Sequence, residues 1–229
     1  VTRIYGEGWT PEYDTLDTFV DSSWYFLRYL DPKDEHDFSD QTLMKKWLPV
    51  DRYSGGSEHT TMHLLYARFF QKALYDLALV PTAEPFNERF NRGLILGPDG
   101  AKMSKSKGNV INPDEFVAKY GADAVRMYLA FIGPYNEPGS YPWNLDGVDA
   151  MRRFLDRVYA LKDAQVDAEV SPALSQALAR AAKKIGGESE RFKFNTAISG
   201  LMIALKELEA AETLPREAFQ EFLRLLAPF

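Results

Sequence analysis

The sequence contains no cysteine among its 229 residues, and this absence excludes disulfide bonds and thiolate zinc sites. It also fits a reducing compartment, so we expect a cytoplasmic protein. No apolar run is long enough to span a membrane, and no signal-peptide pattern opens the chain. We therefore expect no association with a membrane.

An excess of positive charge is also lacking. The chain carries 27 lysine and arginine residues against 33 aspartate and glutamate residues, which gives a formal net charge of −6. Such a surface as a whole is not suited to nucleic acid, so any RNA contact must come from local basic patches. Hydrophobic residues make up 45% of the chain and aromatic residues 14%, which is typical of a globular protein with one large domain or two modest ones.

The sequence does contain a stretch, residues 101–109, in which lysines and serines alternate. An apolar run at residues 93–96 predicts a buried strand before it, and Gly-Pro-Asp-Gly at residues 97–100 predicts a sharp turn. Asn-Pro-Asp-Glu at residues 112–115 predicts a helix start with a side-chain cap. Lysines and hydroxyls on such a loop suit a polyanion that is bound and released, although an ordinary solvated loop has a similar composition.

Lys-Met-Ser-Lys-Ser at residues 102–106 resembles the second signature of class I aminoacyl-tRNA synthetases, and the flanking Gly-Asn and Asn-Pro-Asp-Glu fit the same family. The resemblance implies that this loop holds the triphosphate of ATP, with Mg²⁺ accompanying the nucleotide, while an amino-acid carboxylate attacks the α-phosphorus. It implies Lys102 and Lys105 as catalytic residues, with Met103, Ser104 and Ser106 in the ATP site. Lysine suits this role because its charge lies on a flexible stem that can follow a phosphate.

Residues 14–20 alternate enough to predict a short strand, and Asp21 or Ser22 can cap a helix running through residues 24–29. The aromatic side chains there can simply be core. The stretch Asp-Thr-Phe-Val-Asp-Ser-Ser-Trp-Tyr-Phe-Leu-Arg, however, resembles leucyl-tRNA synthetases in particular. That resemblance implies that Phe19, Ser22 and Tyr25 line the amino-acid pocket, and residues three apart at a helix start do share a face.

Residues 50–53 predict another short strand, followed by Ser-Gly-Gly-Ser and an amphipathic helix over residues 60–79. This order is the usual place for a nucleotide in an open parallel sheet. His59 and His63 lie one helical turn apart, which leaves a zinc site open, and a packed core position is open for His63. Resemblance to the Gly-Gly-x-Glu-His-x-x-x-His sequence of leucyl enzymes implies instead that His63 reaches the leucine pocket. It further implies adenosine contacts from Gly55, Gly56, Glu58 and His59.

The three motifs each follow a short predicted strand, and in a parallel sheet such points fall on one carboxyl edge, where ligands bind. Arg92 stands where family members commonly carry a glutamine that helps to hold the adenylate, so its role as a ligand stays open. The predicted fold class is α/β, with the second half of a class I synthetase Rossmann-like parallel sheet followed by an α-helical bundle. Apolar residues at helical spacing after residue 146 predict that bundle, and Pro172 after Ser171 predicts a helix start within it.

Three domains are predicted. Residues 1–112 form the carboxyl-terminal half of the catalytic domain, residues 113–145 form a connector that contacts the tRNA stem, and residues 146–229 form part of the helical anticodon-binding domain. Basic residues of the bundle are candidates for phosphate contacts, although an ordinary solvated helix face explains each of them taken singly. These residues are Arg152, Arg153, Arg157, Lys183, Lys184, Arg191 and Lys193.

The first signature of the family, His-Ile-Gly-His, is absent, and the histidines at positions 36, 59 and 63 cannot replace it. We expect the carboxyl-proximal half of a leucyl synthetase catalytic fold, inactive alone. Its expected partners are leucine, ATP, tRNA(Leu) and the missing amino-terminal half. The reaction implied is activation of leucine to leucyl-adenylate and transfer to the tRNA. Two alternatives stay open: a non-catalytic adenylate- or RNA-binding piece or split subunit that needs a partner, and a nucleotidyltransferase that acts without tRNA.

Overall fold

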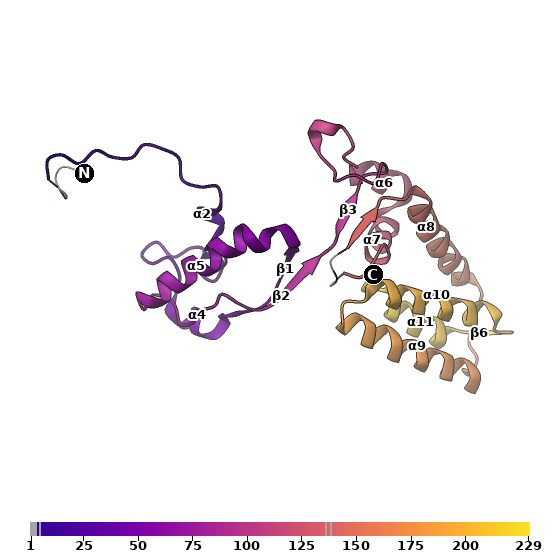
Figure 1. Cartoon of the computed structure of the whole chain (residues 1–229). Coiled ribbons are helices and arrows are strands. Elements are labelled where there is room, and N and C mark those ends of the chain that lie inside the picture. Colours follow the sequence, from indigo (N-terminus) through magenta and orange to yellow (C-terminus); the bar gives the residue numbers. More distant parts are fainter. Residues whose placement is uncertain (1–3, 5, 136, 138) are drawn as a thin grey trace. The chain divides into compact units, whose positions relative to one another are not determined.

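The computed structural model describes residue 4, residues 6–135, residue 137 and residues 139–229. The chain divides into two compact units, Val1–Phe90 and Asn91–Phe229, which are described separately (Figure 1). Both units combine helices with short strands. The predicted α/β class with parallel strands and a helical bundle is confirmed.

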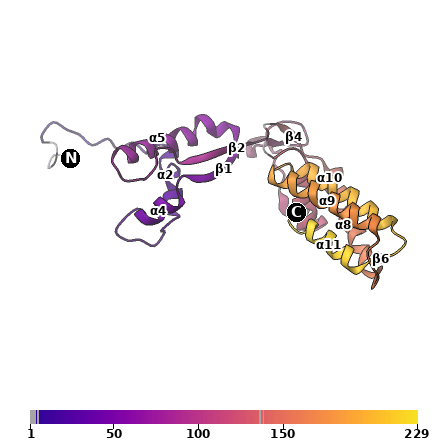
Figure 2. The ribbon, with the colours of Figure 1, turned by 90° about the horizontal axis from the view of Figure 1, so that it is seen from below.

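Unit 1 places short helices and one long helix around a two-stranded sheet. Helix α5 runs beside the β1–β2 pair (Figure 2), and Ala67 from α5 packs in one core cluster with Phe26, Leu27, Met44 and Val80. The elements are α2 (Phe19–Ser22), α3 (Tyr25–Arg28), α4 (Gln41–Trp47), β1 (Val50–Gly56), the 3₁₀ helix η1 (Ser57–Thr61), α5 (His63–Asp76) and β2 (Phe86–Arg92), whose last two residues belong to unit 2.

The strand predicted at residues 14–20 is wrong. The Asp17 carboxylate accepts a hydrogen bond of 2.9 Å from the Phe19 amide, and the Asp17 carbonyl accepts one of 3.0 Å from the Val20 amide. These bonds close a helical turn, because an aspartate side chain competes for backbone donors that a strand would need. The helix predicted over residues 24–29 is shorter than expected: α3 starts at Tyr25, because Trp24 has the non-helical angles φ −138° and ψ 3°, and it ends at Arg28.

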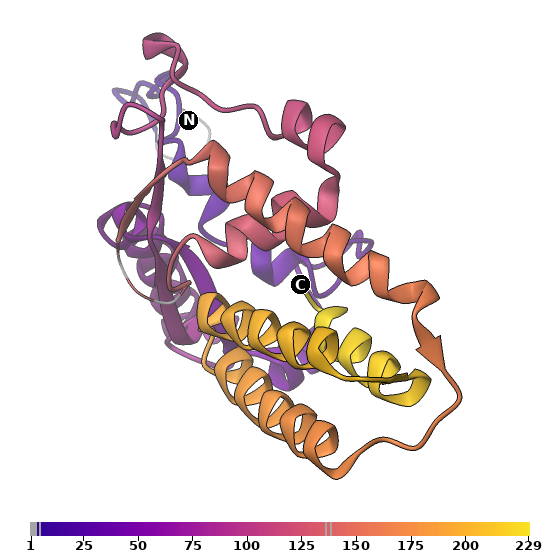
Figure 3. The same ribbon diagram turned by 90° about the vertical axis from the view of Figure 1, so that its right-hand side faces the viewer.

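Unit 2 begins with a parallel strand pair and continues as packed helices. Strand β3 pairs with β4 in the register Leu94–Ser140, Ile95–Tyr141 and Leu96–Pro142. The orange-to-yellow helices α9, α10 and α11 lie side by side (Figure 3). The elements are β3 (Leu94–Leu96), η2 (Lys105–Lys107), α6 (Pro113–Tyr120), α7 (Ala122–Phe131), β4 (Ser140–Pro142), α8 (Leu145–Ala160), η3 (Leu161–Asp163), β5 (Gln165–Val166), α9 (Pro172–Glu190), α10 (Phe194–Ala210), β6 (Leu214–Pro215) and α11 (Arg216–Leu226).

The core of unit 2 joins α7 to the helices that follow it. Val125 and Met127 of α7 lie in the same buried cluster as Phe154 of α8, Leu201 of α10 and Phe222 of α11. The predicted connector at residues 113–145 therefore shares its core with the bundle. The predicted domain boundaries stay a prediction.

Helix starts predicted from local sequence are confirmed in unit 2. The side chain of Asn112 accepts a hydrogen bond of 3.1 Å from the Asp114 amide, directly before α6. Ser171 accepts one of 3.3 Å from the Leu174 amide at the start of α9. Gly121 separates α6 from α7 with φ +89°, a backbone conformation that favours glycine.

The described residues do not form a single parallel sheet that joins the three motif strands. They form three two-stranded sheets, with β1 beside β2, β3 beside β4, and β5 beside β6. The sequences of β2 (Phe-Asn-Glu-Arg-Phe-Asn-Arg) and β4 (Ser-Tyr-Pro) are weakly apolar and do not predict strands. Their pairing depends on tertiary contacts, which local sequence does not report. Among the helices described, none has both the length and the apolar character needed to cross a membrane.

Candidate active site

The amino-acid pocket residues predicted in unit 1 converge on two histidines. Phe19 at the start of α2 lies edge-on to His59, with ring centroids 6.4 Å apart. His59 lies edge-on to His63 at 6.3 Å, and His63 lies 6.4 Å from Tyr25 of α3. Tyr53 of β1 completes the group, 5.7 Å from His63. We call these five residues the aromatic–histidine cluster.

A chain of hydrogen bonds runs through this cluster. The hydroxyl oxygen of Tyr53 lies 2.8 Å from the hydroxyl of Tyr25 and 2.8 Å from Nε2 of His63. The His63 side chain is buried, and desolvation, followed by the nearby charges of His59 and Arg89, lowers its pKa. Burial and the hydrogen bond with Tyr25 raise the pKa of Tyr53. Both groups are therefore neutral near pH 7, and sequence reasoning did not identify Tyr53.

The two histidines offer little support for a zinc site. His59 belongs to the 3₁₀ helix η1 and His63 begins α5, because Met62 breaks the predicted helix with φ −115° and ψ −108°. Within the part of the chain that the structure describes, no group of three or more histidine, cysteine, aspartate or glutamate side chains is arranged to hold a metal ion. In the same residues, Nδ1 of each of the two histidines is buried without a hydrogen-bond partner.

Arg89 of β2 lies against Gly55 and binds the backbone of Gly56 at the end of β1. Its guanidinium donates hydrogen bonds of 2.9 Å to the Gly56 carbonyl and 3.2 Å to the Tyr53 carbonyl, and another to the Phe90 carbonyl. The Glu58 carboxylate lies over Gly56, where a Cβ atom would come within 2.5 Å of Glu58 Oε2. Because Gly56 has no side chain, this carboxylate has room to lie there. Arg89 is a second residue of the site that sequence reasoning missed.

Residues 101–109 of unit 2, which we call the lysine loop, form a turn that is held by backbone contacts. The Gly97 amide donates a hydrogen bond of 2.8 Å to the Ala101 carbonyl, and Leu96 bridges to Lys102 in antiparallel fashion. Lys105 begins the 3₁₀ helix η2, which ends at Gly108 in the left-handed conformation with φ +67°. The side chains of Lys102 and Lys105 are exposed, as expected for cations that meet a solvated anion.

Asn109 braces this loop from inside. Its Oδ1 accepts a hydrogen bond of 2.8 Å from the Ser104 amide, and its Nδ2 donates to Asp99 at 3.2 Å and to the Lys102 carbonyl at 3.3 Å. The pKa of Asp99 is lowered mainly by a hydrogen bond from the Ala101 amide, and also by one from Asn109. The Ser104 and Ser106 hydroxyls lie 2.8 Å apart. Met103 packs against the core of unit 2, which anchors the middle of the loop.

Ser22 and Arg92 both make contacts within the chain that bear on their predicted roles as ligands. The Ser22 hydroxyl donates a hydrogen bond of 3.1 Å to the Phe19 carbonyl, so it closes the turn of α2. Arg92 places its guanidinium 5.6 Å from the centroid of the Tyr135 ring, as a cation–π pair. That contact accounts for arginine at this position without a ligand.

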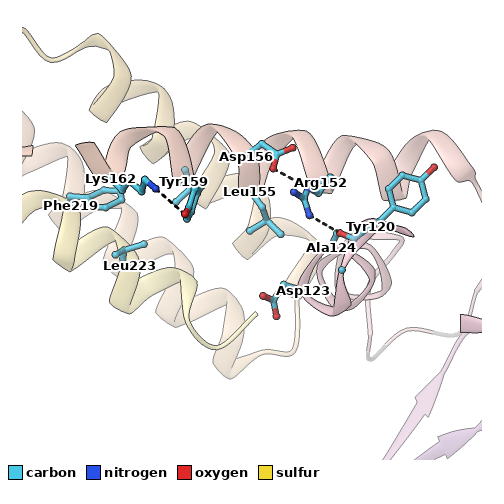
Figure 4. A pocket seen from close by; sticks show the side chains of 12 residues that line it. Tyr120, Asp123, Ala124, Arg152, Leu155, Asp156, Tyr159, Lys162, Phe219 and Leu223 are labelled. Atoms are coloured by element: carbon cyan, nitrogen blue, oxygen red, sulfur yellow. Dashed lines mark hydrogen bonds and ion pairs between the residues drawn. The ribbon is translucent and has the colours of Figure 1, made fainter. Parts of the chain in front are cut away.

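A cavity of about 470 Å³ in unit 2 has none of the residues predicted to bind leucine or ATP in its lining, although it includes Arg152, a candidate for phosphate contacts. Its apolar lining comes from Leu155 and Val158 of α8 and from Phe219 and Leu223 of α11. At its rim Arg152 is engaged by Asp156 at 2.9 Å and by the Tyr120 carbonyl at 3.3 Å (Figure 4). These charges are already paired, so the rim is not a prepared anion site.

Most basic residues proposed for phosphate contacts have a carboxylate partner. Arg152 pairs with Asp156, Arg153 with Asp149, Arg157 with Glu209, Arg191 with Glu188 and Lys193 with Glu137. Ion pairs on exposed helix faces are common and weak. The ordinary explanation of these residues as solvated helix faces is therefore favoured by the structure.

The sequence and the fold both match known synthetases. A family model described as tRNA synthetases class I (I, L, M and V) matches residues 5–138. The fold is similar to that in the crystal structure of a ternary complex of AgnB2 LeuRS from Agrobacterium radiobacter with tRNA and LeuAMS, with a TM-score of 0.83 and 39% identity. That match covers 95% of this chain and 31% of the other, so the present chain spans about a third of the length of that LeuRS. The predicted resemblance to leucyl-tRNA synthetases is confirmed, and the chain belongs to the class I tRNA synthetase family that comprises the I, L, M and V enzymes.

Proposed function

We propose that this chain is part of a leucine–tRNA ligase, which activates leucine with ATP and transfers it to tRNA(Leu). The observation that carries the proposal is the lysine loop, a braced turn that presents Lys102 and Lys105 to solvent in a chain of this family. The similarity to LeuRS in complex with tRNA and LeuAMS supports leucine and tRNA as partners. The remainder of the synthetase is a further partner, because this chain spans about a third of that relative.

The proposed division of roles follows the two units. In unit 1 the rings of Phe19, Tyr25 and His63 enclose the leucine side chain together with Ser22, since an apolar lining favours an aliphatic side chain. The Glu58 carboxylate over Gly56 accepts hydrogen bonds from ribose hydroxyls, since one carboxylate can accept two donors. His59 and Gly55 complete the adenosine contacts. In unit 2, Lys102 and Lys105 bind the triphosphate, with Met103, Ser104 and Ser106 shaping the loop.

The proposed chemistry is displacement at the α-phosphorus. A carboxylate oxygen of leucine forms a bond to phosphorus while the bond to the bridging oxygen breaks, and pyrophosphate leaves with that electron pair. Negative charge grows on the leaving pyrophosphate, and the Lys105 ammonium stabilises it more in the transition state than in the ground state. Mg²⁺ arrives with ATP and needs no cage of protein ligands. The tRNA ribose hydroxyl then attacks the acyl carbon and releases AMP.

Leucine-dependent ATP–pyrophosphate exchange tests the proposal directly. We expect no exchange from this chain alone and leucine-dependent exchange when the remaining part of the synthetase is supplied. In the complete enzyme, Lys105→Ala should slow exchange about 100- to 1,000-fold while the KM for leucine stays unchanged. Lys107→Ala is the matched control, because Lys107 lies on the same turn outside the Lys-Met-Ser-Lys-Ser motif.

Three results would contradict the proposal. Exchange driven by another amino acid but not by leucine would exclude leucine as the substrate. Equal losses for Lys105→Ala and Lys107→Ala would reduce the loop to a general electrostatic role. Binding of adenylate or RNA by a reassembled protein that catalyses no exchange would favour the non-catalytic binding module instead.

A further inference from the structure

We infer that the carboxylate of Asp99 limits how tightly the lysine loop holds pyrophosphate, so that this product leaves once the adenylate has formed. The inference deepens the proposed function and rests on it for the identity of the phosphate ligand. Asp99 stands directly before a loop that carries three lysines, and its carboxylate is bound to both ends of that loop. A negative charge is thus built into a loop whose expected ligand is an anion.

Three hydrogen bonds fix the Asp99 carboxylate against the loop. The Ala101 amide donates to Oδ1 at 3.1 Å, and Nδ2 of Asn109 donates to Oδ1 at 3.3 Å and to Oδ2 at 3.2 Å. Ala101 precedes Lys102 in the chain, and Nδ2 of Asn109 also binds the Lys102 carbonyl at 3.3 Å. The negative charge is therefore held beside the backbone that carries Lys102.

Gly97 provides the surface on which this carboxylate lies. A Cβ atom at Gly97 would come within 2.7 Å of Asp99 Oδ1 and within 3.1 Å of Asn109 Nδ2. The turn itself is closed by the backbone, since the Gly100 amide donates a hydrogen bond of 2.9 Å to the Gly97 carbonyl. Closing the turn therefore does not require the carboxylate, and a role for its charge has to be sought in the loop.

The charge of Asp99 is present near pH 7. A hydrogen bond from the Ala101 amide, a weaker one from Asn109 and the charge of Lys107 lower the pKa of this carboxyl group. Phosphate groups that bind to the lysines of the loop therefore approach a fixed negative charge. The repulsion between them opposes the attraction of the lysines.

The size of this repulsion suits a product that has to be released. Asp99 is exposed, so water and salt screen its charge to a large extent. Pyrophosphate carries several negative charges, and the summed repulsion amounts to about two- to fivefold in affinity. Such an effect leaves the loop able to bind the triphosphate, and it shortens the time for which pyrophosphate stays bound. Product release limits the turnover of many enzymes.

Asp99→Asn removes the charge and keeps an oxygen for the Ala101 amide. Its new NH2 group would face Nδ2 of Asn109, so the loop is braced less well, and a purely structural role of Asp99 predicts weaker binding of phosphate. A role of the charge predicts the opposite sign. In leucine-dependent exchange by the complete synthetase, we expect Asp99→Asn to lower the KM for pyrophosphate about two- to fivefold. Added salt should shrink this gain, and the KM for leucine should stay unchanged.

Two controls separate the charge from the loosening of the loop. Glu212→Gln makes the same change in net charge at an exposed position between α10 and β6, and it should leave the KM for pyrophosphate unchanged. Asn109→Ala loosens the loop without changing its charge, and it should not lower that KM. An unchanged or raised KM in Asp99→Asn, or an equal fall in either control, would overturn the inference.

A second measurement needs no catalysis. Carboxyl ¹³C NMR of the 229-residue chain follows the pKa of Asp99 with and without inorganic tripolyphosphate. Because the coupling between two binding events is reciprocal, an anion that Asp99 repels must raise the pKa of Asp99. We expect this rise, and a smaller one in Lys105→Ala. The absence of a rise would overturn the inference, whereas a rise without leucine-dependent exchange in the complete enzyme would count against the proposed function alone.

Discussion

The side chain of Asn109 accepts a hydrogen bond of 2.8 Å from the amide of Ser104. The same side chain donates to Asp99 and to the Lys102 carbonyl, so one residue joins the entry and the exit of the lysine loop. The conformation of this loop is therefore stabilised by a side chain outside the Lys-Met-Ser-Lys-Ser motif. Asn109 is the position at which the loop can be loosened without changing its charge.

Asn109→Ala should increase amide hydrogen exchange at residues 104–107 about fivefold, because a hydrogen bond of this kind contributes about 1 kcal/mol. The midpoint of thermal unfolding should hardly change, since the loop is exposed. Asn112→Ala is the control: it removes the cap of α6 and should destabilise that helix while leaving exchange at residues 104–107 as it was. Equal protection of the loop in both variants would show that Asn109 does not brace it.

Arg89→Ala should weaken unit 1 by about 2 kcal/mol, because a charged donor to the carbonyls of Gly56 and Tyr53 is lost. Hydrogen exchange of the β1 amides measures this change in the free energy of local opening. Arg52→Ala is the matched control on the same strand pair, since Arg52 and Glu88 form an exposed ion pair at 2.8 Å. That control should cost less than about 1 kcal/mol. A larger effect for Arg52 than for Arg89 would contradict the assignment.

Local sequence predicted the elements whose hydrogen bonds are local. Asn112 and Ser171 cap their helices through bonds that span two or three residues, and both starts were predictable. The alternation of residues 14–20 favoured a strand, whereas the Asp17 carboxylate binds the Phe19 amide two residues away and starts a helical turn. A recognised Asx turn would have signalled this outcome.

The missed site residues act over longer distances in sequence. Tyr53 meets Tyr25 across 28 positions, and Arg89 meets the Gly56 carbonyl across 33. No periodicity of the sequence reports such contacts, because they depend on how β1, β2 and α3 pack. The resemblance to leucyl enzymes identified the motifs on either side of Tyr53 and left Tyr53 itself unmarked.

Gly56→Ala and Gly93→Ala should separate a change in the site from a change in stability. At Gly56 a Cβ atom would meet the mobile end of Glu58 at 2.5 Å, and φ −63° with ψ 149° suits alanine. We expect stability within about 0.5 kcal/mol of the wild type, and a raised KM for ATP in the complete enzyme because the carboxylate is displaced. Urea unfolding and pyrophosphate exchange provide the two measurements.

Gly93→Ala is the counterpart. There a Cβ atom would lie 2.7 Å from the Gly139 carbonyl oxygen, which cannot rotate away, so the backbone of β3 or β4 must shift. We expect a loss of about 1–3 kcal/mol in the stability of unit 2. If Gly56→Ala were the more destabilising of the two, the placement of Glu58 over that glycine would be incorrect.

Glu84 should titrate far below an ordinary glutamate. Arg68 binds its carboxylate with two hydrogen bonds of 2.9 and 2.8 Å, and Lys72 adds one of 2.6 Å, which together lower the pKa of Glu84 to about 2. Because the folded-state pKa is lowered, the stabilisation is complete above pH 4.5 and is lost as the pH falls from 4.5 toward about 2. The side chains are about half exposed, so the contribution stays below about 1 kcal/mol.

Carboxyl ¹³C NMR across this pH range measures the midpoint. Arg68→Ala should raise the pKa of Glu84 more than Lys72→Ala does, since Arg68 makes two of the bonds, and added salt should shrink both effects. A midpoint near 4.5 in the wild type would show that these ion pairs do not persist in solution.

The boundary between Phe90 and Asn91 leaves the residues predicted to bind leucine and adenosine in unit 1, and those predicted to bind the triphosphate in unit 2. We expect Tyr25→Ala, before the boundary, to change the use of the amino acid, and Lys105→Ala, after it, to change the use of the phosphates. Combining one of each closes a thermodynamic cycle. If the two losses of transition-state stabilisation add, the two residues act independently in catalysis. If the double variant loses more or less than the sum, the difference in kcal/mol measures how strongly the reacting molecule couples the two residues.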